Sequence, residues 1–172
     1  MLQFFAGHPS VVNVWGNRFG GLTVLLPRRN AKIGVWHIDE THSLVLQNKN
    51  KTIHELINSV IFSMNAICMD FETSETFESG AVAAIESQVI EFKSKFMHHE
   101  EIQAARALWY HFKLNFALSP SVENFVRTAL SKNETESILE ILKEKAGDDY
   151  NAAIRYISER YLKYGGPRYG CW

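Results

Sequence analysis

Residues 52–71 read TIHELINSVIFSMNAICMDF, and this stretch dominates the fold prediction because its apolar residues recur at helical spacing. They lie three and four positions apart, as on one face of an α-helix, and are Ile53, Leu56, Ile57, Val60, Ile61, Met64, Ile67 and Phe71. Thr52 and Glu55 form a capping-box pattern, which is typical of a helix start. The stretch therefore predicts one long amphipathic helix, with Ile57 and Ile61 central on its buried face.

Upstream of this helix, the chain alternates between apolar and polar residues in the manner of short β-strands. Turn-forming residues separate four runs that are rich in Val, Leu, Ile and Trp: Val11–Trp15, Leu22–Leu26, Ile33–Ile38 and Ser43–Gln47. Alternate side chains of a strand share one face, so such a sheet presents one apolar face that needs a cover. We expect a four-stranded antiparallel meander, covered by the helices that follow.

Downstream, the sequence predicts further helices over Val82–Phe96, Glu100–Leu118, Ser119–Leu130, Asn133–Gly147 and Asp148–Gly165. The segment Ala107–Leu118 also alternates as a strand would. Helix is preferred there because strong helix formers run into it from Glu100. Ser119 and Pro120 suit the N-cap and the first position of a helix.

These patterns predict an α+β fold, in which an N-terminal antiparallel β-meander packs against a C-terminal bundle of about five to six helices. A chain of 172 residues is of the usual size for one domain. We expect a single domain over residues 1–172, with a β-region (1–51), long helices (52–118), a sub-bundle of short helices (119–164) and a tail (165–172).

The composition and the N-terminus predict a cytoplasmic or nuclear protein. Hydrophobic residues make up 46% of the chain, which is too many for a disordered protein. Cys68 and Cys171 are the only cysteines and suggest no disulfide framework. The N-terminus lacks the basic start of a signal sequence, and no run approaches the roughly 20 apolar residues that span a bilayer. Neither a cofactor nor a membrane partner is expected.

Charge is distributed unevenly along the chain. Residues 1–51 hold six Lys/Arg and two Asp/Glu, and residues 52–101 hold two and nine, although the whole chain has a net charge of only −1. Basic side chains beside aromatic rings can hold phosphates and stack bases. One alternative function is therefore nucleic-acid binding through the basic N-terminal turns, by Arg18, Arg28, Arg29 and Lys32 with Trp15, Phe19 and Trp36.

A second alternative is an enzyme with a histidine-centred or metal site. His37, Asp39 and His42 lie within six residues around a predicted turn, where two imidazoles and a carboxylate could converge on a divalent metal. The spacing matches no established zinc pattern, and a solvent-facing turn explains the same residues. Motifs for a catalytic nucleophile or a phosphate-binding loop are absent from the sequence.

The C-terminal tail offers two large aromatic side chains, Tyr169 and Trp172, of the kind that form interface hot spots. Because no enzyme motif is present, the main interpretation is a small nonenzymatic regulatory protein that acts through protein–protein interaction. Its expected partner is another protein, bound with the help of the tail. Nucleic acid is the alternative partner, and the helical half also allows self-association into a homo-oligomer.

Overall fold

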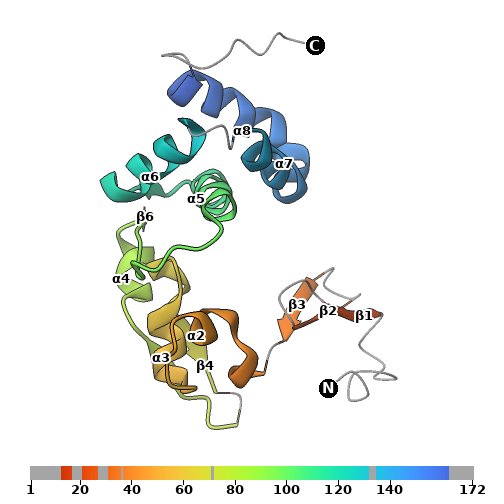
Figure 1. Cartoon of the computed structure of the whole chain (residues 1–172), viewed down its shortest axis with the longest axis vertical. Helices are drawn as coiled ribbons and strands as arrows, with labels where there is room; N and C mark the ends of the chain where they lie inside the picture. The colour runs from red at the N-terminus through yellow and green to blue at the C-terminus, as the bar shows by residue number, and fades with distance from the viewer. Residues whose placement is uncertain are drawn as a thin grey trace. The chain divides into compact units, whose positions relative to one another are not determined.

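A computed structural model describes residues 13–16, 21–26, 31–35, 37–70, 72–131 and 135–162. They form a mixed chain in which a β-sheet is followed by helices (Figure 1), so the predicted α+β class is confirmed. The chain divides into two compact units, Met1–Ser59 and Val60–Trp172. Among the described residues, no helix combines the length and the apolar character that crossing a membrane requires.

The first unit contains a three-stranded antiparallel sheet in the order β1-β2-β3. Its strands are β1 (Asn13–Gly16), β2 (Leu22–Leu26) and β3 (Ala31–Val35). The central strand buries its middle residue, since Val24 is only 2% exposed. Short apolar runs separated by turn residues predicted these three strands, and their positions agree with the sheet.

The fourth predicted strand, Ser43–Gln47, is wrong, because this segment forms the helix α2 (His42–Leu46). A strand would place Leu44 and Leu46 on the same face. In the structure Leu44 is fully buried, whereas Leu46 is 46% exposed, so the two side chains have different environments. A single-turn 3-10 helix, η2 (Ile38–Glu40), precedes α2.

The helix predicted from Thr52 begins as expected. The Thr52 hydroxyl accepts a hydrogen bond from the backbone N–H of Glu55 at 3.2 Å, and Ile57 is buried. However, this helix, α3 (Ile53–Ser59), ends long before Phe71. Beyond it the backbone pairs with a distant segment: Ser63 N–H donates to Glu91 C=O at 2.9 Å, and Lys93 N–H donates to Ile61 C=O at 2.8 Å.

The second unit opens with small pieces of sheet and one short helix. After the 3-10 turn η3 (Ser63–Asn65), β4 (Ile67–Met69) pairs antiparallel with β5 (Thr76–Glu78). The helix α4 (Ala81–Glu86) follows. The helix predicted over Val82–Phe96 therefore holds only as far as Glu86. Gln88 then takes a left-handed backbone conformation with φ 54°, and the next two residues form a strand.

Among the residues that the structure describes, four longer helices follow in the second unit: α5 (Glu100–Leu114), α6 (Pro120–Ser131), α7 (Thr135–Ala146) and α8 (Tyr150–Ile157). The last is continued by a π-helical turn, η5 (Ser158–Leu162). Between α5 and α6, β7 (Ala117–Leu118) pairs in parallel with β6 (Val89–Ile90). The preferred helix over the ambiguous Ala107–Leu118 segment is thus confirmed as far as Leu114.

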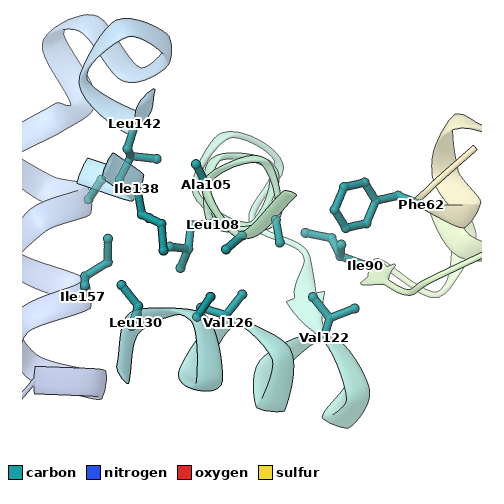
Figure 2. Close-up of a cluster of buried hydrophobic side chains, with 14 of the residues drawn as sticks. Phe62, Ile90, Ala105, Leu108, Val122, Val126, Leu130, Ile138, Leu142 and Ile157 are labelled. Atoms are coloured by element: carbon teal, nitrogen blue, oxygen red, sulfur yellow. The ribbon is translucent and has the colours of Figure 1, made fainter. Parts of the chain in front are cut away.

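The core of the second unit lies where α5 meets α6, α7 and α8 (Figure 2). Helices far apart in sequence contribute fully buried side chains to it, among them Leu108, Val122, Val126, Ile138 and Leu142. Apolar residues at helical spacing in each helix account for this shared core. The packing fixes α5, whose polar edge carries the candidate site.

Candidate nucleic-acid interface

The predicted basic interface of the N-terminal turns falls mostly outside the described residues. Those outside are Arg18, Phe19, Arg28, Arg29 and Trp36. Trp15 lies on β1 opposite Thr23 and is 38% exposed, and Lys32 lies on β3 opposite Leu25. The two described members therefore belong to strands on either side of β2, and this interface stays a prediction.

The predicted metal cluster is represented by two of its three side chains. His37 Nδ1 lies 3.2 Å from Asp39 Oδ2, and both side chains are more than half exposed. His42 begins α2, but its side chain is outside the described part of the chain. Within that part, no three His, Cys, Asp or Glu residues are grouped so as to hold a metal ion. The tail residues Tyr169 and Trp172 are likewise outside the described residues.

A polar cluster in the second unit was missed by the sequence analysis. It consists of Asn65 from η3 and of Gln103, Arg106 and Tyr110 from α5, and we call it the Arg106 cluster. Arg106 donates to Gln103 Oε1 at 3.1 Å and to the Tyr110 hydroxyl at 3.0 Å. The same hydroxyl accepts a hydrogen bond from Asn65 Nδ2 at 3.3 Å. The cluster therefore joins two elements through one phenol oxygen.

Packing holds the guanidinium of Arg106 in place. Its central carbon lies 5.6 Å from the centre of the Phe62 ring and 5.7 Å from that of the Tyr110 ring. Phe62 is fully buried and meets the Tyr110 ring edge to face at 5.5 Å. Such contacts restrict a long side chain. Arg106 is thus a preorganised cation whose side chain is only partly buried.

The electrostatics of the cluster are visible in Tyr110. Burial alone would raise the pKa of this phenol, but the positive charge of Arg106 and the hydrogen bonds from Arg106 and Asn65 outweigh it. The pKa of Tyr110 is consequently lowered from its ordinary value of 10.0, and Lys145 on α7 contributes to the same effect. The site therefore favours negative charge.

Cationic, amide and hydroxyl groups in this arrangement can hydrogen-bond phosphate oxygens and the edges of nucleobases. The signal in the sequence was the spacing of Gln103, Arg106 and Tyr110, at steps of three and four, which puts them on one helix face. It was overlooked because the same spacing is common among solvated residues.

Comparison with solved structures identifies proteins that share this fold. A tRNA nucleotidyltransferase complexed with a primer tRNA and an ATP analogue superposes with a TM-score of 0.63 at 17% identity, covering 94% of this chain and 48% of that one. The Bacillus stearothermophilus CCA-adding enzyme in complex with CTP gives 0.55 at 20% identity, covering 95% and 42%. The Thermotoga maritima CCA-adding enzyme complexed with tRNA gives 0.54 at 14% identity, covering 86% and 36%.

This chain thus spans less than half the length of each of these solved structures. No protein-family model and no curated protein sequence matches the chain. At identities of 14% to 20%, the similarity to these structures establishes a shared fold alone.

The interpretation of the chain as a nonenzymatic regulator that acts through protein–protein interaction is wrong. The three solved proteins compared above are CCA-adding enzymes or tRNA nucleotidyltransferases, each in complex with tRNA or a nucleotide. The comparisons favour the alternative of nucleic-acid binding, and they give no support to a protein partner.

Proposed function

We propose that this chain is the RNA-binding region of an enzyme of the tRNA nucleotidyltransferase type. The observation that carries the proposal is the shared fold, which extends over 86% to 95% of the chain in the three comparisons with CCA-adding and tRNA nucleotidyltransferase structures. Two of those structures contain tRNA. Binding of RNA by this chain is therefore the first expectation to test.

The Arg106 cluster supports the proposal from the side of chemistry. Its guanidinium, two side-chain amides and phenol are joined to one another by hydrogen bonds of 3.0 to 3.3 Å. Nucleic acids present complementary acceptors on their phosphates and base edges. Gln103 is only 4% exposed, so its amide is held by the fold. We assign Arg106 the role of anchoring a phosphate or a nucleobase edge of the RNA.

The test is binding of fluorescently labelled tRNA, measured by anisotropy between about 50 and 200 mM salt, the range over which phosphate contacts weaken strongly. We expect the wild-type chain to bind at low salt and to release the RNA as salt rises. Arg106→Gln should weaken binding by roughly tenfold, as expected for loss of a charge-assisted contact.

Lys113→Gln is the matched control, because Lys113 is an exposed cation of the same helix. Its ammonium lies 5.7 Å from the centre of the Trp109 ring, outside the cluster. Absence of tRNA binding at low salt would refute the proposed function. Equal effects of Arg106→Gln and Lys113→Gln would refute the role assigned to Arg106.

A further inference from the structure

A second cationic site lies in the second unit, where α6 meets α8 and η5. Here one carboxylate oxygen serves two arginines: Glu123 Oε1 accepts from Arg160 Nη2 at 2.9 Å and Nε at 3.3 Å, and from Arg127 Nη2 at 3.4 Å. Arg127 lies one turn along α6 from Glu123, whereas Arg160 comes from η5. The carboxylate thus brings two guanidinium groups from different elements together.

Each of these arginines also lies over a tyrosine ring. The guanidinium carbon of Arg127 is 5.4 Å from the centre of the Tyr161 ring, and that of Arg160 is 5.8 Å from the centre of the Tyr156 ring. The two rings meet edge to face at 6.2 Å. We call these five residues the Glu123 cluster. Because rings and carboxylate restrain both guanidinium planes, little side-chain freedom is left to lose on binding.

The Glu123 cluster is open to solvent and carries excess positive charge. The side chains of Arg127 and Arg160 are 54% and 49% exposed, and that of Glu123 is 26% exposed. One carboxylate cannot neutralise two guanidinium groups. Arg160 reaches Glu123 through Nη2 and Nε, and Arg127 reaches it through Nη2, so the Nη1 group of each arginine takes no part in these hydrogen bonds and can donate to an external anion.

We propose that the Glu123 cluster binds a backbone phosphate of RNA, with Arg127 and Arg160 as its two donors. This inference rests on the proposed function, since it names a further contact for the same ligand. Paired arginines with free N–H groups match the oxygens of a phosphate. The cluster belongs to other elements than the Arg106 cluster, so RNA bound at both would be held at two points of the second unit.

The test compares the Arg127→Gln/Arg160→Gln double variant with the wild type in binding a labelled single-stranded RNA. Each lost phosphate contact lowers the magnitude of the slope of log affinity against log salt by about 0.7 for a single strand. Loss of the one phosphate held by this cluster should therefore lower it by about 0.7 and weaken binding roughly tenfold near 150 mM salt. Circular dichroism and the melting temperature of each variant report whether the fold is retained.

Two control variants separate phosphate binding from structural support. Glu123→Gln keeps both arginines and a side-chain oxygen that can accept from them, and it removes the negative charge that repels phosphate, so RNA binding should be tighter than in the wild type. Arg155→Gln removes an exposed positive charge from α8 outside the cluster and should change the affinity by less than about twofold.

The outcomes distinguish this inference from the proposed function. If the wild type binds RNA and the double variant binds with the same affinity and salt slope, the inference is overturned while the proposed function stands. If Glu123→Gln weakens binding as much as the double variant does, the cluster acts through the fold and the inference is also overturned. If the wild type binds no RNA, both proposals fail together.

Discussion

Leu108 is fully buried on α5, in contact with side chains from the neighbouring helices of the second unit. Leu108→Ala should lower the free energy of unfolding by about 2 to 5 kcal/mol, because it removes buried apolar atoms and leaves a cavity. Leu114, on the same helix but 40% exposed, gives the matched control, and Leu114→Ala should cost less than about 1 kcal/mol. If chemical denaturation shows that Leu108→Ala and Leu114→Ala lower the free energy of unfolding equally, the assigned core is wrong.

Three tyrosines should titrate separately at alkaline pH. The pKa of Tyr110 is lowered because Arg106 and the hydrogen bonds of Arg106 and Asn65 outweigh its burial. Burial raises the pKa of Tyr156, and burial together with the neighbouring Tyr156 raises the pKa of Tyr161 to about 12. Tyrosinate absorbance should therefore show an early step that Tyr110→Phe removes and a late step that Tyr161→Phe removes.

The same shifts act on stability in opposite directions. Below about pH 10 the unfolded chain holds the Tyr110 proton more tightly than the folded chain does, so Tyr110 makes the free energy of unfolding rise with pH there. Between about pH 10 and 12 the folded chain holds the Tyr161 proton more tightly, so Tyr161 makes that free energy fall. An early absorbance step that persists in Tyr110→Phe would contradict the assignment.

At the scale of single elements, the sequence predicted the starts of α3, α4 and α5 better than their ends. Local chemistry sets a start, as the Thr52 hydroxyl does for α3. Ends depended on distant partners: α3 stops where the backbone of Ile61 and Ser63 pairs with residues 91 and 93, and no local pattern could reveal that pairing. Ser43–Gln47 was assigned to the wrong class because its run of only three apolar residues, Leu44 to Leu46, fits either period.

Ser119 caps α6 in the way that the sequence predicted. Its hydroxyl accepts a hydrogen bond from the backbone N–H of Val122 at 3.4 Å, and Pro120 occupies the first helical position. Ser119→Ala should lower the free energy of unfolding by about 1 kcal/mol, and Ser119→Gly by only a few tenths, because glycine is a tolerated N-cap residue. Thermal denaturation of both variants tests the cap. If Ser119→Ala and Ser119→Gly lose the same stability, Ser119 does not act as the N-cap of α6.

At the scale of the whole molecule, the division into Met1–Ser59 and Val60–Trp172 leads to a prediction about autonomy. The core cluster that contains Leu108 is drawn entirely from residues 61–157. A fragment of residues 60–172 should therefore be helical by circular dichroism and unfold cooperatively. Leu108→Ala should destabilise the fragment and the full chain equally, within about 0.5 kcal/mol. A fragment without cooperative unfolding would show that the second unit depends on the first.

Function was the least predictable property, for a physical reason. Arg106, Asn65 and Glu123 lie in unremarkable local sequence, and only the packing of distant elements gives them their neighbours. The basic N-terminal turns drew attention because their charges are adjacent in sequence. Those turns were the basis for predicting nucleic-acid binding, whereas the residues proposed above to contact RNA lie in the second unit.

The parallel pairing of β6 with β7 leads us to expect an order of folding events in the second unit. It joins residues 89–90 to residues 117–118, and α5 lies in the chain between them. Closing that loop costs entropy before the amides of Ala117 and Ser119 can reach the carbonyls of Gln88 and Ile90. Helix α5 needs only local contacts and forms sooner. We therefore expect docking of α5, rather than its coiling, to be the slow step of folding.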